Sequence, residues 1–150
     1  MDHLAFDLGA SGGKMFRGAF DGERLALSPV FSFPNRMVRL GGGLYWDFPS
    51  IYTHMCEGIR KAAADKPFGS FGVDSFNNDF SLIGPQGDLL APVRAYRDAR
   101  TQKHEEAIYR RVPRRKLYGY TGNQLAPFNT FMQLAAMREE GQGFLLDHAH

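Results

Sequence analysis

The segment that most constrains the fold of this chain is residues 4–14, Leu-Ala-Phe-Asp-Leu-Gly-Ala-Ser-Gly-Gly-Lys. An apolar stretch delivers one carboxylate, Asp7, into a run of glycines and a hydroxyl residue. The next residues, 15–20, are again largely apolar, so the pattern predicts a β-hairpin with a glycine-rich tip. Exposed backbone N–H groups at such a tip suit phosphate, and Asp7 beside them suits hydrated Mg²⁺.

The spacing of this segment matches neither a Walker loop nor the G-x-G-x-x-G motif. Lys14 is followed by Met15 rather than by Ser or Thr, and Leu8 stands where a Walker loop has its first glycine. An ordinary glycine-rich hairpin with one exposed acid is therefore the alternative that the segment alone leaves open.

Composition limits the class of protein. The 150 residues are 43% hydrophobic and can build one core of ordinary domain size. With 18 basic and 16 acidic residues, neither nucleic acid nor an anionic membrane is an expected partner. The only cysteine, Cys56, excludes an intrachain disulfide, and no signal peptide or apolar stretch of about 18 residues is visible, so we expect a cytoplasmic protein.

Hydrophobic periodicity predicts an α/β domain with a mixed sheet. Asp47 and Pro49 suit the start of a helix that runs to Ala64, with Ile51, Met55, Ile59 and Ala62 on its inner face. On that helix we expect His54 to be solvated and Cys56 to be buried. Further strands are expected at 25–33, 44–46, 68–76 and 79–83, with a turn at 84–87. Helices are expected at 99–112, from Pro113 to Gly119 or Gly122, and from Asn129 or Thr130 onward. The last helix should turn Phe131, Leu134, Ala135 and Met137 inward.

The only basic cluster comprises five residues between positions 110 and 116. Nucleic-acid binding would require stacking aromatic residues beside it, for which Tyr118 and Tyr120 are the candidates. A solvated helix face is the simpler interpretation. The cluster consists of Arg110, Arg111, Arg114, Arg115 and Lys116.

The hairpin segment resembles the phosphate loop of the FGGY carbohydrate kinases, and further segments follow in the order seen in the rhamnulokinase group of that family. The resemblance covers nearly the whole chain, and the ordered set is more specific than any one motif. These segments are Phe33-Pro34-Asn35, residues 44–47 (Leu-Tyr-Trp-Asp), residues 71–74 (Phe-Gly-Val-Asp), residues 96–101 (Tyr-Arg-Asp-Ala-Arg-Thr), residues 120–124 (Tyr-Thr-Gly-Asn-Gln) and residues 127–130 (Pro-Phe-Asn-Thr).

The resemblance implies an actin-like ATPase (ribonuclease H-like) fold and ATP-dependent, Mg²⁺-assisted phosphorylation of a ketose in sugar catabolism. Family members are several times longer and have two domains, so residues 1–150 would form the leading portion of the first domain, without the second. The general base, the adenosine pocket and the second phosphate segment are expected after His150. Within residues 1–150 we therefore expect no catalytic residue. The partners would be a sugar and either the missing half of the kinase or a second copy.

Site residues follow from the resemblance. Asp7 would orient Mg²⁺, and the sugar would be held by Asn77, Asn78 and Asp79. Two departures bear on this: the family's Asp-Thr-Trp-Gly-Val-Asp-Phe is here residues 74–80, Asp-Ser-Phe-Asn-Asn-Asp-Phe, and Ala-Ser-Ser-Gly-Arg ends here in lysine. Lysine keeps the charge but loses the bidentate fork of arginine. The residues expected to bind the nucleotide are Gly9, Ala10, Ser11, Gly12, Gly13 and Lys14.

Two other functions remain open from the sequence. Asp7, Glu57 and Asp74 occupy a strand, a helix and a later strand, as the metal-binding carboxylates do in ribonuclease H-like nucleases, where two metals clamp a phosphodiester. The near-neutral charge offers little to hold a polyanion. The third interpretation is a non-catalytic lobe, a truncated pseudokinase that binds a sugar or packs against another chain.

Overall fold

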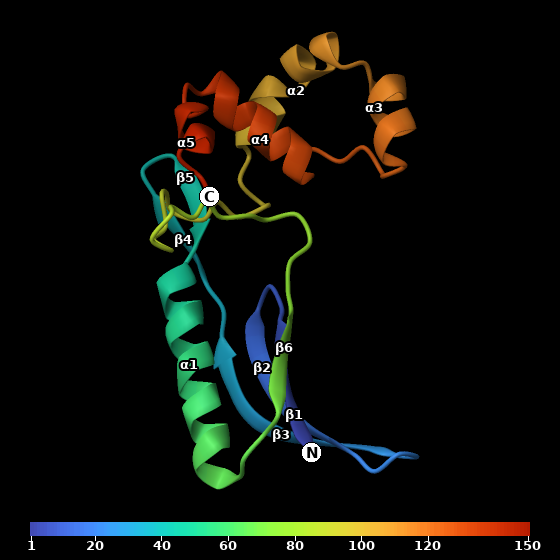
Figure 1. Ribbon diagram of the computed structural model, residues 1–150. Helices are drawn as coiled ribbons and strands as arrows, with labels where there is room; N and C mark the ends of the chain where they lie inside the picture. The colour runs from blue at the N-terminus through green and yellow to red at the C-terminus, as the bar shows by residue number, and fades with distance from the viewer. The chain divides into compact units, whose positions relative to one another are not determined.

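The computed structural model describes all 150 residues, which form two compact units (Figure 1). The first unit comprises Met1–Met37 and Asp47–Asn77, and the second comprises Val38–Trp46 and Asn78–His150. The chain therefore leaves the first unit at residue 37, returns at residue 47 and leaves again between Asn77 and Asn78.

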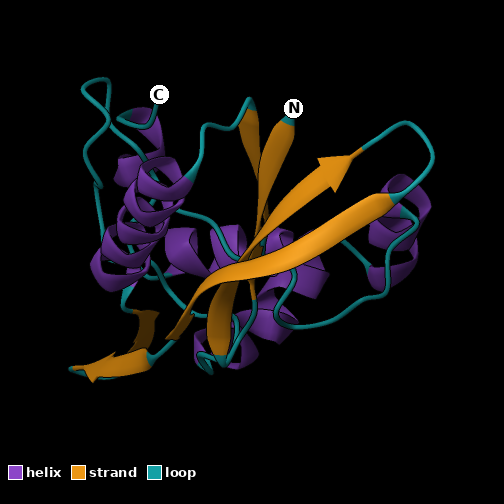
Figure 2. Ribbon diagram, turned by 90° about the horizontal axis from the view of Figure 1, so that it is seen from below, coloured by secondary structure: helices purple, strands orange, loops and turns teal.

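The first unit is built on a mixed four-stranded sheet (Figure 2). Its strands are β1 (Asp2–Leu8), β2 (Gly12–Phe20), β3 (Leu25–Pro34) and β6 (Ser70–Asp74), in the order β3-β2-β1-β6. The first three pair antiparallel, whereas β6 runs parallel to β1. The expected hairpin and mixed sheet are confirmed, although β6 is shorter than the predicted strand 68–76.

One face of this sheet carries the core of the unit. Leu4 and Phe6 of β1 are buried, and Met15 of β2 joins them against Ala62 of the helix α1 (Phe48–Asp65). Because side chains alternate along a strand, the residues between them in β1 lie on the opposite, exposed face. The sheet thus has one apolar face under α1 and one more exposed face, which carries Asp7 and Lys14.

The helix α1 begins as the sequence predicts. The Asp47 carboxylate accepts a hydrogen bond from the Ser50 amide at 3.3 Å, and Pro49 occupies the first turn. The expected solvation of His54 is only partly met: its side chain is 32% exposed, and its ring stacks on Phe33 with centroids 4.8 Å apart and an interplanar angle of 24°. Cys56 is half-buried rather than buried. A histidine off the apolar stripe can still be covered when a neighbouring strand ends beside it.

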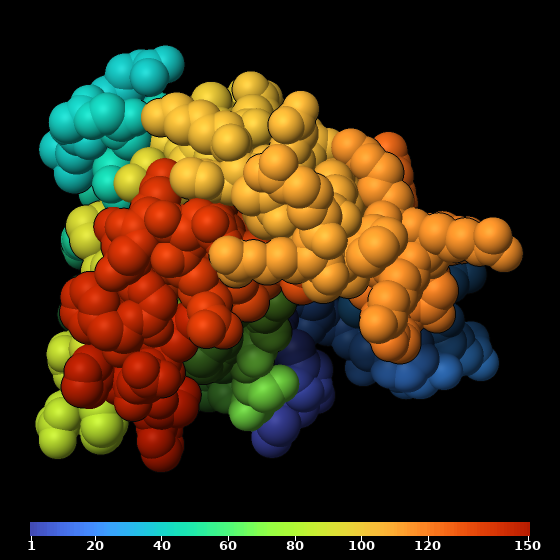
Figure 3. All heavy atoms as spheres, turned by 90° about the horizontal axis from the view of Figure 1, so that it is seen from above, coloured from blue at the N-terminus to red at the C-terminus, as the bar shows by residue number.

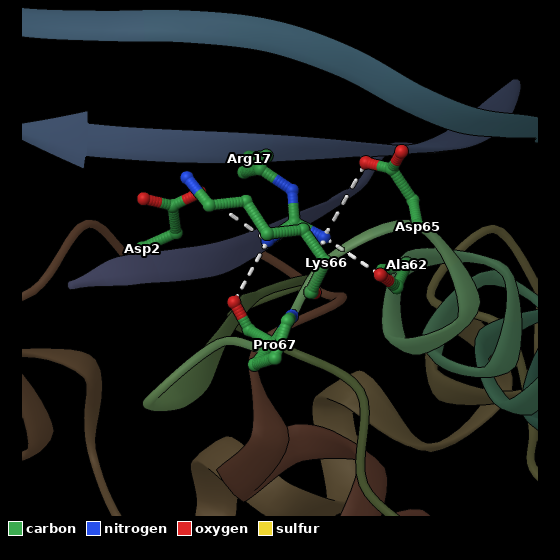
Figure 4. Close-up of polar contacts among 6 residues, drawn as sticks. All are labelled: Asp2, Arg17, Ala62, Asp65, Lys66 and Pro67. Atoms are coloured by element: carbon green, nitrogen blue, oxygen red, sulfur yellow. Dashed lines mark hydrogen bonds and ion pairs between the residues drawn. The ribbon is translucent and has the colours of Figure 1, made fainter.

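Arg17 ties the hairpin to the end of α1 (Figure 4). Its side chain is only 8% exposed, and its Nη2 donates to the carbonyl oxygens of Ala62 at 2.7 Å and Lys66 at 2.9 Å. Its Nη1 lies 3.4 Å from the Asp2 carboxylate, which also pairs with Lys66 Nζ at 3.0 Å. The buried guanidinium therefore adds a second donor to the Ala62 carbonyl, which also accepts from the Lys66 amide at 3.1 Å, and supplies a donor to the Lys66 carbonyl just after the helix.

The second unit contains short strands and helices. The strand β5 (Gly43–Trp46) pairs with β4 (Met37–Leu40), and the segment around Arg94 bridges to Tyr45. The helix α2 packs against α4, and Figure 3 shows the red C-terminal residues beside the yellow start of α2. The helices are α2 (Arg100–Arg111), α3 (Arg114–Thr121), α4 (Thr130–Glu139) and α5 (Phe144–Asp147).

Several boundaries in this unit agree with the sequence. Pro113 precedes α3, and Gly122 ends it in the left-handed conformation at φ 63°. The turn at residues 84–87 closes through a hydrogen bond from the Gly87 amide to the Gly84 carbonyl at 2.9 Å. No helix in the structure has the length and apolar character needed to span a membrane.

Two expectations in this unit were wrong, the second only in part. Residues 79–83 do not form a strand, and only Ile83 makes an isolated bridge, with Leu89. The buried face of α4 differs in part from the predicted one: Met137 is buried as expected, whereas Phe131 is 38% exposed and Leu134 and Ala135 are half-buried. Its buried residues are Met132, Gln133, Ala136 and Met137. The polar Gln133 occupies a core position because its amide has three acceptors nearby.

Candidate functional site

The tip of the hairpin between β1 and β2 presents free backbone donors. The Gly9 amide donates to the Gly12 carbonyl at 2.9 Å, which closes the turn. Ala10 and Ser11, at the apex, are exposed, and neither of their N–H groups makes a hydrogen bond. The two adjacent amides and the Ser11 hydroxyl are therefore available to an anion.

Asn35, which follows β3, holds this tip from behind. Its backbone amide donates to the Ser11 carbonyl at 3.2 Å, and its side-chain Nδ2 donates to the Gly9 carbonyl at 3.0 Å. Asn35 is 8% exposed, and its Oδ1 is buried without a partner. Because the carbonyls of the turn are bound from this side, its N–H groups are left for a ligand on the outer side.

Phe33 forms the floor beneath the glycines. A Cβ on Gly13 would overlap the Phe33 ring, and one on Gly12 would lie 2.9 Å from the Phe33 carbonyl oxygen. His54 stacks on the same ring. The glycines are thus required by close packing against β3, and the position of the tip is fixed by that packing.

A row of charged residues crosses the open face of the sheet next to the tip. In the strand register, Asp7 pairs with Lys14 of β2 on one side and with Asp74 of β6 on the other. All three are exposed, and none makes a side-chain hydrogen bond or ion pair. Two carboxylates side by side near free amides and a lysine fit a hydrated Mg²⁺ that accompanies a phosphate chain.

The structure contradicts the predicted nuclease site, which requires the carboxylates of Asp7, Glu57 and Asp74 to lie together. Glu57 belongs to α1, which covers the apolar face of the sheet, and its carboxylate pairs with His54 at 3.1 Å. Asp7 and Asp74 lie on the opposite face. No three acidic, histidine or cysteine side chains come together to hold a metal ion. The three carboxylates of the predicted nuclease site are therefore not assembled.

The residues expected to bind the sugar fall on either side of the boundary between the units. Asn77 ends the first unit, whereas Asn78 and Asp79 begin the second. The Asp79 carboxylate accepts from Trp46 Nε1 at 2.5 Å and from Gln133 Nε2 at 3.3 Å. Asp79 is therefore oriented by two neutral donors, which leave its negative charge without a cationic partner.

Aromatic side chains extend this polar cluster in the second unit. Tyr96 lies 6.5 Å from Trp46 and 6.1 Å from Phe128, measured between ring centroids. Thr130 Oγ1 donates to the Asn78 carbonyl at 2.8 Å, beside the Gln133 amide. Small-molecule sites commonly combine aromatic walls with a few fixed polar groups, as this cluster does.

Two of the five residues of the basic cluster, Arg111 and Arg114, pair with acidic side chains. Arg111 lies 2.7 Å from Glu139, and Arg114 lies 2.5 Å from Glu105. Arg114 also covers the ring of Tyr109 at 3.9 Å. These ion pairs join α2 to α4 and α3 to α2 on the surface of the second unit.

The sequence of the chain is similar to those of curated sugar kinases. No protein-family model matches the chain. A curated rhamnulokinase from Bacteroides thetaiotaomicron is 38% identical over 136 residues, which is 90% of this chain and 28% of the relative. Other curated rhamnulokinases are 31–34% identical. The chain spans about 30% of the length of the curated relatives it matches.

Solved structures share the fold. A ligand-bound xylulose kinase from Lactobacillus acidophilus matches with a TM-score of 0.78 at 15% identity, over 99% of this chain and 30% of that protein. A Plasmodium falciparum glycerol kinase solved with ADP matches with a TM-score of 0.67 at 17% identity, over 95% of this chain and 29% of that protein.

The chain therefore has the actin-like ATPase fold and is related to the FGGY carbohydrate kinases. Within that family, the curated sequences that it resembles are rhamnulokinases. Both expectations drawn from the ordered motifs are confirmed.

Sequence reasoning missed several residues that the structure gathers around the expected ones. Asn35, Trp46, Tyr96 and Phe128 all stand in motifs quoted for the resemblance, yet none was given a role. Gln133 carried no signal, because a polar residue in a helix is usually solvated. The roles of Asp7, of the tip and of Asn77–Asp79 stay predictions.

Proposed function

We propose that this chain supplies the first phosphate-binding segment and part of the sugar site of an ATP-dependent kinase that phosphorylates a ketose resembling rhamnulose. The observation that carries the proposal is the tip of the hairpin, where free amides of Ala10 and Ser11 lie beside the Asp7 carboxylate. Relationship to rhamnulokinases supports a sugar as the substrate class.

Phosphoryl transfer asks a protein mainly to position two reactants and to neutralise charge. Ala10 and Ser11 would hold phosphate oxygens through their amides, and Lys14 would add positive charge. Asp7, with Asp74 beside it, would hold the water shell of Mg²⁺. The bound ion would neutralise charge on the phosphates.

The acceptor would be held by the polar cluster of the second unit. Asn78 and Asp79 offer amide and carboxylate groups for sugar hydroxyls, and Asn77 extends the set. Trp46 and Gln133 hold the Asp79 carboxylate in one orientation, so its charge is available to a hydroxyl donor. Tyr96 and Phe128 would cover the apolar edge of the sugar.

We propose further that residues 1–150 are the leading portion of the first kinase domain, with the general base supplied by polypeptide beyond His150. The supporting observation is that relatives of this chain are more than three times as long. Ketose phosphorylation by residues 1–150 alone would contradict this placement of the base.

The test of the phosphate site is a titration of this chain with MgADP, followed through backbone amide chemical shifts. Saturable shifts at Ala10 and Ser11 are expected, and Asp7→Asn or Lys14→Met should weaken binding about tenfold, as the loss of one charged hydrogen bond does. Glu106→Gln, which removes an exposed carboxylate from α2, is the matched control and should leave the affinity unchanged.

The kinase proposal is tested separately with the longest polypeptide that the gene encodes. Ketose-dependent ADP release is expected, and Asp7→Asn should lower kcat on the order of 100-fold. If the chain binds ketoses by calorimetry while no encoded polypeptide turns over ATP, the non-catalytic sugar-binding function replaces the kinase.

A further inference from the structure

A pocket in the second unit is lined by none of the residues proposed above to bind phosphate or sugar. It has a volume of about 70 Å³ and is lined by parts of β5, the segment 80–94 and the helices α2 and α4. A water molecule occupies about 30 Å³ in the liquid, so the pocket has room for roughly two waters or one small ion. Its polar lining comes from Tyr45, Ser81, Arg94, Arg100 and Gln142.

Arg100, the first residue of α2, is the unusual member of this lining. It is 6% exposed, and its guanidinium makes no hydrogen bond or ion pair. Only its backbone amide is bound, to Asp98 Oδ1 at 2.9 Å. A guanidinium carries five N–H donors. None of the Arg100 nitrogens is sealed inside the protein, so these donors face the space of the pocket and are available to an acceptor there.

The acidic groups nearby are engaged elsewhere. The Asp98 Oδ2 lies 3.0 Å from Arg94 Nη1 and also accepts from the Leu44 amide at 2.6 Å. Glu140 lies 3.7 Å from His104 Nε2. Asp98 and Glu140 act on Arg100 only through longer-range attraction. The lining of the pocket contains the guanidinium groups of Arg94 and Arg100 and no carboxylate.

Burial lowers the pKa of Arg100, and the like charge of Arg94 lowers it further, whereas Glu140 and Asp98 oppose both effects. An arginine nevertheless stays protonated in proteins. The uncompensated charge therefore persists at neutral pH, and the group that best relieves it is an anion.

We propose that this pocket binds a small oxyanion of the size of phosphate, held by the Arg100 guanidinium with help from Arg94. Ser81 and Gln142 line the same space and supply neutral donors. The first turn of α2, a helix of 12 residues, adds the favourable end of its dipole. The oxyanion is either free inorganic phosphate or the phosphate group of a larger metabolite.

The test is a titration of the whole chain with inorganic phosphate at constant ionic strength, followed by amide and side-chain chemical shifts. Saturable shifts at Tyr45, Ser81 and the Gln142 amide are expected, separate from any at Ala10 and Ser11. A parallel titration with glycerol phosphate distinguishes the two sources. If glycerol phosphate reproduces the shifts, the pocket accepts the phosphate group of a larger metabolite; if only inorganic phosphate does, the pocket binds the free ion. Absence of saturable shifts at the pocket with both probes would overturn the proposal.

Two variants assign the binding to the pocket. Arg100→Gln should weaken phosphate binding at least tenfold, whereas Lys103→Gln, which removes one exposed positive charge from the same helix, should change it less than twofold. Equal losses in both would mean general attraction by positive charge and would contradict the site. If Arg100→Gln does not fold, Ala91→Leu decides, because it fills the pocket without touching a charge and should abolish the shifts.

Discussion

Arg17 and Arg100 are both buried, yet their surroundings are opposite. Arg17 in the first unit binds the carbonyls of Ala62, Lys66 and Pro67 and pairs with Asp2. Arg100 in the second unit makes no contact of that kind. The same side chain therefore serves in one place to join a strand to a helix end and in the other to leave a charge facing a pocket.

The contrast teaches how to separate a structural charge from a binding charge. Breaking a fully satisfied buried network destabilises a protein, because the remaining partners stay buried without compensation. A buried charge without a partner costs stability instead, and such groups gather at functional sites. Stability measurements on the two arginines should therefore move in opposite directions.

The largest effect is expected from Arg17→Met. Its loss removes the donor from the Lys66 and Pro67 carbonyls after α1 and leaves Asp2 with Lys66 alone, whereas the Ala62 carbonyl keeps the Lys66 amide. The first unit should therefore lose about 3 kcal/mol. Hydrogen exchange of the β1 and β2 amides measures this loss within the first unit. Arg60→Met, an exposed arginine on α1, is the control and should change protection by less than about 0.5 kcal/mol.

A smaller effect is expected from substituting two glycines, of which one is closely packed in the first unit and the other has open space around it in the second. Gly13→Ala would drive a methyl group into the Phe33 ring and should destabilise the first unit by about 1–3 kcal/mol. Gly119→Ala, inside α3 with open space around it, should stabilise the second unit by up to about 1 kcal/mol. The comparison fails if the two variants shift hydrogen-exchange protection of their own units in the same direction.

Arg100→Met should reverse the sign seen for Arg17. Replacing a buried, unpaired guanidinium with an apolar side chain should raise the stability of the second unit by about 1 kcal/mol in phosphate-free buffer. Trp46 is the only tryptophan and lies in this unit, so its fluorescence during urea unfolding follows the change. A midpoint that falls would show that Arg100 has a structural partner after all.

The smallest effect concerns pH. The hydrogen bond from Lys66 lowers the pKa of Asp2, against the opposing effect of burial, and the charges of Lys66 and Arg17 lower it further. A carboxyl whose pKa is lower in the folded state stabilises that state above its ordinary pKa of 3.8 and loses this contribution as pH falls below it. Protection of β1 amides in the wild type should exceed that in Asp2→Asn at neutral pH, and the excess should vanish in acid.

Local patterns predicted the elements that local interactions decide. The hairpin, the capped start of α1 and the glycine end of α3 each depend on residues close in sequence. The predicted strand at 79–83 failed for the opposite reason. Trp46 and Gln133, 33 and 54 residues away, hold Asp79 in an irregular segment, and no local pattern records those contacts.

The residues of the candidate site differ in the same respect, because only those defined by local sequence could be predicted. The tip residues from Gly9 to Lys14 could be named from spacing, but the support from Asn35 could not, because it depends on where β3 ends. The burial of Arg100 was equally out of reach. Its pocket is built from segments between Tyr45 and Gln142, almost a hundred residues apart.

The strand β6 has a practical consequence for handling the chain. Strands in parallel pairing are normally covered on both faces, yet every residue of β6 is exposed, with Phe71 at 53% and Val73 at 46%. Its outer edge also presents unpaired backbone groups, which in a concentrated solution invite a second molecule to add a strand. Preparations for spectroscopy should therefore stay dilute, or carry Val73→Lys to discourage stacking of one sheet on the next.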